Sequence, residues 1–185
     1  MRKMLEESPS QTAGPYVHLG CTPTVAGYTN ADESADLGSQ MINGNPTGVR
    51  VALTITVFDG AGEPLRDGMI EIWQPGPDGS FGPTDGFCHW GRQAMHMQTG
   101  LARFDTLKPG APEGQSPHFL IWITARGINL GLTTRIYLPD AENKNDPVFK
   151  LSEKRCNTLT AQSVDVGYHH NIHLQGEHET IFFNV

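Results

Sequence analysis

The sequence predicts an all-β domain, a β-sandwich with an extended N-terminal arm and little helix. Short runs of apolar residues recur at intervals of about 8–12 residues, a spacing typical of sandwiches and barrels. Turn residues separate these runs, since the 185 residues include 21 Gly and 13 Pro. A chain of this length fits a single domain with one core.

The first 47 residues lack the periodicity of a strand or a helix. They are rich in turn pairs such as Ser8-Pro9, Gly14-Pro15 and Asn45-Pro46. Such a segment cannot form its own core and is expected to lie over another surface. We therefore divide the chain into an arm, residues 1–47, expected to pack on a partner chain, and a β-sandwich, residues 48–185.

The strands of the sandwich follow in order. Apolar residues at alternate positions from Val49 to Val57 predict a half-buried first strand. His118–Thr124 is almost entirely apolar, which predicts a strand covered on both faces. The remaining strands are expected at Met69–Trp73, Leu101–Leu107, Thr134–Leu138, Tyr168–Gln175 and Thr180–Asn184, the last two joined as a hairpin around residues 176–179. One helical turn is expected near Ala141–Lys144.

Charge and cysteine content exclude several classes of protein. The net charge of −7 and the absence of a Lys/Arg cluster argue against nucleic-acid binding. Cys21, Cys88 and Cys156 show no metal-ligand spacing and are expected to be reduced thiols. Because no apolar run resembles a signal peptide or a membrane span, we expect a soluble, cytoplasmic protein.

The residues alone leave the chemistry undecided. His169, Asn171 and His173 share one strand face, but a polar outer face on an edge strand is favoured over a metal site. Arg126, after the most apolar strand, could bind a carboxylate, although a structural salt bridge is the commoner role. Tyr16 is by itself more often a packing aromatic.

Four segments nevertheless resemble the intradiol ring-cleaving dioxygenases. They are Ser8–Tyr16 (SPSQTAGPY), Val57–Gly68 with Ile70–Gln74 (VFDGAGEPLRDG and IEIWQ), Thr106–Gly110 (TLKPG) and Gln175–Phe183 (QGEHETIFF), and together they span most of the chain. The resemblance implies O₂-dependent cleavage of catechols at an Fe³⁺ ion held by two tyrosines and two histidines. Tyrosinate oxygens are hard ligands that favour Fe³⁺.

This chain lacks most of those ligands. Gly79–Arg92 and Gly110–Pro117, where the tyrosines are expected, contain none. The paired histidines are replaced by His118 followed by Leu120, and Gln115 stands where an arginine is expected. We therefore expect no metal ligand and no catalytic residue on this chain, with His118 a buried structural residue.

The pattern is similar to the iron-free alpha chain of two-chain members of the family. The resemblance implies a beta subunit that carries the Fe³⁺, a large alpha–beta hetero-oligomer, and protocatechuate, a carboxylated catechol, as substrate together with O₂. It further implies that Thr12, Gly14, Pro15, Tyr16 and Arg126 line the substrate cavity beside the iron.

Two rival hypotheses remain open from the sequence. The prealbumin-like sandwich also occurs in transthyretin-like binding modules without a catalytic role, and a fold does not fix a function. An autonomous metalloenzyme using His169 and His173 is the other alternative.

Overall fold

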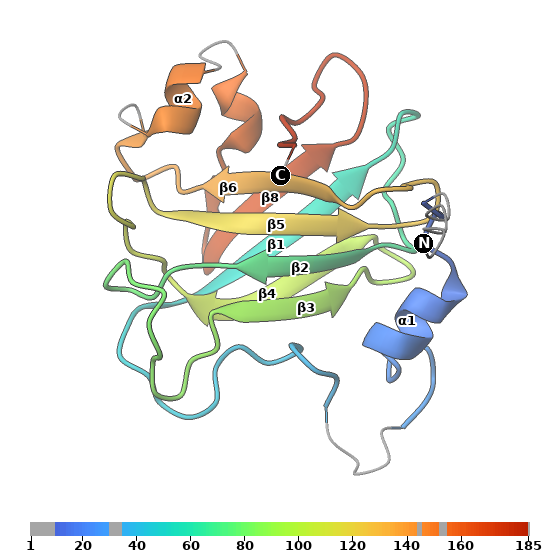
Figure 1. The fold of residues 1–185 in the computed structure, drawn as a ribbon, viewed down its shortest axis with the longest axis horizontal. Helices are drawn as coiled ribbons and strands as arrows, with labels where there is room; N and C mark the ends of the chain where they lie inside the picture. Colours follow the sequence, from blue (N-terminus) through green and yellow to red (C-terminus); the bar gives the residue numbers. More distant parts are fainter. Residues whose placement is uncertain (1–9, 30–34, 144–145, 152–154, 185) are drawn as a thin grey trace, which may run out of the picture.

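The computed structural model describes residues 10–29, 35–143, 146–151 and 155–184. Within these residues the fold is a sandwich of two four-stranded sheets (Figure 1). One sheet has the order β4-β1-β8-β7 and comprises Leu101–Leu107, Arg50–Phe58, Gly167–His173 and Gln162–Val164. The other has the order β3-β2-β5-β6 and comprises Trp90–Ala94, Met69–Trp73, His118–Thr124 and Leu132–Tyr137. The predicted all-β sandwich is confirmed.

The core lies between the two sheets and follows from the alternation of the central strands. In β1, Leu53, Ile55 and Val57 are fully buried. In β5, Phe119 and Ile121 are buried in the same way. β1 runs antiparallel to β4 and parallel to β8, so the first sheet is mixed. The period of two therefore places one face of each sheet in a shared apolar layer.

The arm contains a helix that the sequence did not predict. α1 spans Pro15–Cys21, with Gly14 as the N-cap residue and Pro15 in the first turn, where its missing N–H costs nothing. It buries no residue, so it leaves no periodic apolar signal. Further along, the arm returns to its own sandwich, because Met41 is 2% exposed within the core and its carbonyl accepts a hydrogen bond from Cys88 N at 2.7 Å.

The predicted C-terminal hairpin is wrong. β8 pairs instead with β7, where Gln162 lies opposite His169. Residues 180–184 form no strand of that sheet; Thr180 Oγ1 accepts from His173 N at 3.0 Å, and the chain then leaves for the other sheet. There Ile181 O accepts from Thr134 Oγ1 at 2.7 Å, so the C-terminal segment bridges the two layers.

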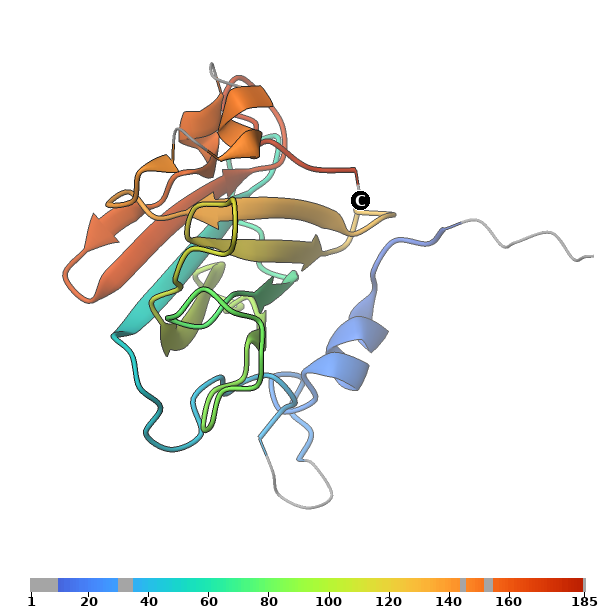
Figure 2. The ribbon, with the colours of Figure 1, turned by 60° about the vertical axis from the view of Figure 1, so that its left-hand side comes forward.

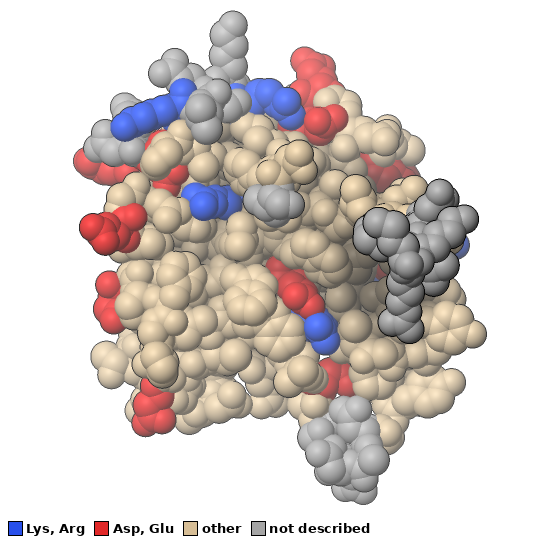
Figure 3. All heavy atoms as spheres, in the orientation of Figure 1, with Lys and Arg blue, Asp and Glu red and all other residues tan. Residues whose placement is uncertain are grey.

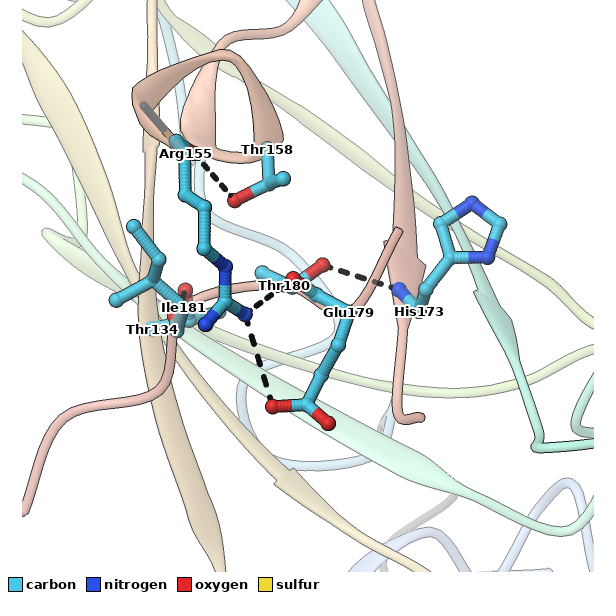
Figure 4. A network of polar contacts seen from close by, with 7 residues as sticks. All are labelled: Thr134, Arg155, Thr158, His173, Glu179, Thr180 and Ile181. Carbon is cyan, nitrogen blue, oxygen red and sulfur yellow. Dashed lines mark hydrogen bonds and ion pairs between the residues drawn. The ribbon is translucent and has the colours of Figure 1, made fainter. Parts of the chain in front are cut away.

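Arg155 fixes the start of this crossing (Figure 4). Its Nη2 donates to the carbonyl of Glu179 at 2.6 Å and lies 3.6 Å from the Glu179 carboxylate. The Arg155 carbonyl in turn accepts from Thr158 Oγ1 at 2.7 Å. These side-chain contacts add to a turn closed by Glu179 N donating to Gly176 O at 3.1 Å, and together they direct the segment across the sandwich.

Other elements also bear on the sequence prediction. The helical turn predicted near Ala141–Lys144 lies partly outside the described residues, because Lys144 is not described, and Asn143 within it has 3₁₀ conformation. Ser8 and Pro9 of the arm also lie outside the described residues. A helix, α2, instead spans Pro147–Leu151 and is followed by the 3₁₀ helix η2, Cys156–Leu159. β3 was not predicted, because its sequence WGRQA does not alternate.

Within the part of the chain that the structure describes, the outer face of β5 is only half-buried beyond His118, which contradicts the predicted burial on both sides. Leu120 and Trp122 are only half-buried, and with Glu71, Trp73 and Thr133 they line an open hollow of about 360 Å³. Trp73 is 47% exposed. Figure 3 shows that charged side chains are sparse over the middle of this face and gather towards its rim.

Cys21 and Cys88 are free thiols, as expected. The thiol of Cys156 donates a hydrogen bond to the carbonyl of Phe149 at 3.4 Å. Among the described residues, no helix combines the length and the apolar character that a membrane crossing requires.

Candidate functional site

The arm and α1 meet the sandwich beside the end of β5, with α1 standing off from the sheet (Figure 2). A pocket of about 220 Å³ lies at this junction. The arm and α1 supply one wall, and loops at one end of the sandwich supply the other. The lining residues are Ala13, Gly14, Pro15, Val17 and His18 from the first wall, and Asp67, Met97, Thr124 and Arg126 from the second.

A hydrogen bond ties the arm to the turn that carries Arg126. Gly127 N donates to Thr12 Oγ1 at 2.6 Å. The turn closes through Ile128 N donating to Ala125 O at 3.1 Å, and Gly127 adopts φ +90°, a conformation that glycine takes without strain. This bond between groups far apart in sequence therefore fixes the arm next to the turn that carries Arg126.

Arg126 forms an ion pair and is still largely open to solvent. Its Nε lies 3.1 Å from Asp67 Oδ2, while its side chain is 81% exposed. The carbonyl of Asp67 lies 3.1 Å from His18 Nε2, and because a carbonyl only accepts, His18 donates from that nitrogen. The salt bridge that was the alternative to ligand binding is thus present, and the guanidinium is nevertheless exposed.

The structure brings most of the predicted substrate-binding residues together. Gly14, Pro15 and Arg126 line one pocket, and Thr12 is bonded at its rim. Tyr16 lies on α1, is 84% exposed and does not line the pocket. Asp67 and His18 are the ionisable lining residues that sequence reasoning missed. Asp67 lies inside the motif Val57–Gly68, but a loop carboxylate gives no local sign of its partner.

The position where the resemblance implies a metal does not suit Fe³⁺ in this chain. His118 is 4% exposed, its Nδ1 is bonded to Ser116 O at 2.8 Å, and burial lowers its pKa. Leu120, next on the same face, has no donor atom. Tyr137 packs beside His118 with ring centroids 5.5 Å apart, and burial raises the pKa of its phenol to about 12.

The surroundings of Tyr137 agree with a structural role. Its hydroxyl lies 3.1 Å from the buried carboxylate of Asp146 and 3.2 Å from Arg135. Across the described residues, no three His, Cys, Asp or Glu side chains come together as a metal site. The donor set around His118 therefore belongs to the packing of α2 against the sheet, as predicted for that histidine.

His169 and Asn171 of β8 lie on the outer face of their sheet and are hydrogen-bonded there, whereas His170 between them is buried. His169 Nδ1 contacts Thr54 Oγ1 at 3.0 Å, and its Nε2 contacts Asn171 Oδ1 at 2.8 Å, so both ring nitrogens are engaged. The predicted polar outer face is confirmed. The predicted edge position is wrong, because β8 lies between β1 and β7.

Solved structures with the same architecture define the class of fold. The chain is similar to an intradiol ring-cleavage dioxygenase from Tetranychus urticae (16% identity, TM-score 0.59, covering 75% of this chain and 88% of that one). It is also similar to the dioxygenase domain of a carbohydrate-binding fusion protein from Streptomyces sp. SirexAA-E (21% identity, TM-score 0.54, covering 91% and 96%). The sandwich is thus of the intradiol dioxygenase type.

Sequence relatives narrow this class. The chain is 35% identical to the protocatechuate 3,4-dioxygenase alpha chain of Pseudomonas putida and 32% identical to that of Burkholderia cepacia, with 98% of each chain covered in both comparisons. The beta chain of the Burkholderia cepacia enzyme is 31% identical over 75% of this chain and 69% of its own length. No family model matches. The chain belongs to the family of protocatechuate 3,4-dioxygenase alpha chains.

Proposed function

We propose that this chain is the iron-free alpha subunit of a protocatechuate 3,4-dioxygenase. In this role it forms one wall of an active site whose Fe³⁺ is held by a beta subunit. The reaction is the O₂-dependent intradiol cleavage of protocatechuate to 3-carboxy-cis,cis-muconate, a step in aromatic catabolism through the beta-ketoadipate pathway. Full-length similarity to two alpha chains supports this function.

One structural observation carries the proposal: the chain builds half of a site. The arm and Arg126 are joined through the bond between Thr12 and Gly127, yet Tyr16 and Arg126 leave more than four fifths of their side chains in solvent. Tyr and Arg are the residues that most often anchor interfaces when a partner covers them. A second chain placed against this wall would complete the cavity.

Each proposed substrate-binding residue has a role that its chemistry allows. Arg126 attracts the ring carboxylate of protocatechuate, with a planar guanidinium suited to a carboxylate. Tyr16 donates a hydrogen bond from its phenol, and Thr12 contributes its hydroxyl at the rim. At Gly14, an added Cβ would meet no atom within 4 Å in this chain, so the bare backbone beside Pro15 is open to a ligand or to the partner.

The arm is proposed to pack on the beta subunit through its first part, within residues 1–47. Its later part is already committed to this chain's own sandwich through Met41. The uncovered face around Trp73 and Trp122 adds apolar surface of the kind that assemblies bury. These features support a hetero-oligomer in which Fe³⁺ is the beta subunit's cofactor.

No observation favours the alternatives. A transthyretin-like module would not require the full-length similarity to dioxygenase chains. A metal site built on His169 and His173 would need free ring nitrogens, and those of His169 are already bonded.

The test compares the chain expressed alone with the chain co-expressed with its beta subunit. Alone, it should be colourless, contain essentially no iron and consume no O₂ with protocatechuate, because its donor set does not suit Fe³⁺. The complex should show the visible absorption of tyrosinate bound to Fe³⁺ and should cleave the ring. The beta subunit expressed alone is the control for iron content. Stoichiometric iron and ring cleavage by the isolated chain would overturn the proposal.

A further inference from the structure

Asp67 occupies the point where the two walls of the pocket meet. Its carboxylate oxygen Oδ2 lies 3.1 Å from Nε of Arg126, and its side chain is 33% exposed. Its backbone carbonyl accepts from His18 Nε2 at 3.1 Å, which holds α1 against the sandwich. Asp67 thus fixes the cation through its side chain and the helix through its backbone, and a side-chain substitution changes only the first contact.

The charges of the pocket oppose one another. Among its lining residues, Arg126 carries a permanent positive charge and Asp67 is the acidic side chain. A carboxylate entering the pocket is attracted by one and repelled by the other over a similar distance. Because Asp67 engages Nε, the edge of the guanidinium formed by its two Nη atoms is the one left to a ligand.

The proposed reaction makes this balance consequential. Intradiol cleavage breaks the bond between the two hydroxylated ring carbons and adds both atoms of O₂, one to each carbon. Each carbon becomes a carboxylate and two protons are released, so the ligand changes from one negative charge to three. A pocket whose cation is unopposed would hold the product more tightly than the substrate.

We propose that Asp67 is a specificity-determining positioning residue for this site. Its oxygen orients Arg126 towards the ring carboxylate. Its negative charge lowers the affinity of the site around Arg126 for anions, so that the trianionic product dissociates. This inference rests on the proposed function, because it requires that Arg126 face the substrate.

Two substitutions separate the oxygen from the charge in the iron-bearing complex. Asp67→Asn keeps an oxygen that can accept from Nε but removes the charge, whereas Asp67→Ala removes both. For Asp67→Asn, KM for protocatechuate and the inhibition constant of 3-carboxy-cis,cis-muconate should fall about threefold to tenfold, the effect of one unit charge several ångströms away in a solvated site. KM for uncharged catechol should stay unchanged. Asp67→Ala should have a higher KM for protocatechuate than Asp67→Asn, because the guanidinium is released.

The controls identify which idea fails. Asp105→Asn removes the carboxylate of another exposed Arg–Asp pair, that of Arg103 on β4, and should change none of these constants. An Asp67→Asn enzyme whose KM for protocatechuate is unchanged or raised would overturn the charge role, and equal values for the two Asp67 variants would overturn the orienting role. Arg126→Ala tests the proposed function itself. It should raise KM for protocatechuate and leave both KM for catechol and the iron content unchanged. An unchanged KM for protocatechuate in this variant would overturn both the binding role of Arg126 and the role of Asp67.

Discussion

The bond between Thr12 and Gly127 provides a direct test of how the arm is held. Replacing Thr12 with Val keeps the shape of the side chain and removes the oxygen that accepts from Gly127 N at 2.6 Å. The bond is neutral and exposed, so its net contribution is about 0.5–1.5 kcal/mol, which corresponds to a factor of roughly 2–12 in the docking equilibrium. Thr12→Ser keeps the oxygen and serves as the matched control.

Hydrogen exchange of the Gly127 amide in the isolated chain measures this bond without the partner. The Val variant should exchange about 2–12 times faster than the wild type, and the Ser variant should stay close to the wild type. In the complex, the Val variant should lose a similar factor in kcat/KM for protocatechuate, because the arm must be docked to complete the pocket. Unchanged exchange in Thr12→Val would show that the arm is held by other contacts and would refute this reasoning.

Two further predictions concern stability. Asp146 is 1% exposed and accepts hydrogen bonds from Ser116 N at 2.8 Å and Val148 N at 2.9 Å. Asp146→Ala should therefore lower the free energy of unfolding by about 3 kcal/mol in urea titrations, whereas Asp105→Ala at the surface should change it by less than about 0.5 kcal/mol. Equal effects of the two substitutions would contradict the structural role of Asp146. Burial lowers the pKa of His170 to about 4, whereas the ordinary value is 6.5, so the unfolded chain binds its proton first. The stabilisation by neutral His170 is complete above about pH 6.5 and falls by at most about 3 kcal/mol as the pH drops towards 4. His170→Leu should therefore flatten the pH dependence of the urea midpoint over that range. An unchanged pH dependence in the variant would contradict the assignment of this effect to His170.

The strands that the sequence predicted best are those whose side chains alternate against one core. β2, β4 and β5 match their predicted bounds, and β1 is displaced by one residue at each end. The predicted hairpin failed because the segment after Thr180 pairs with the other sheet: Phe183 N donates to Thr133 O at 2.8 Å, and Thr134 Oγ1 donates to Ile181 O. Such a contact leaves no periodic pattern, since pairing between sheets depends on the tertiary fold rather than on neighbours in the chain.

The site was less accessible to sequence reasoning than the fold. From residue type alone, Arg126 was more probable as a surface ion pair, and the structure does contain that pair with Asp67. Only the family resemblance indicated that the arm and the turn after β5 belong to one site. The contact that joins them links residues 115 positions apart, a separation over which neither periodicity nor local spacing carries information. Helix α1 was missed for a different reason. Its hydrogen bonds are local, but it buries no residue and therefore has no periodic apolar pattern.

The proposed function gives one physical explanation for the missing tyrosine and histidine ligands and for the exposure of the proposed binding residues. Two homologous chains that share one active site require only one set of metal donors, so the donor positions of the other chain are free to change. At Leu120 the change is to an apolar side chain on the half-buried outer face of β5, where it lines an apolar hollow with Trp73 and Trp122. The proposed binding residues face the opposite constraint, because on this proposal Tyr16 and Arg126 must reach a ligand held by another chain. Their exposure in this chain is what a shared site would demand, and the proposal makes the activity a property of the interface rather than of either chain.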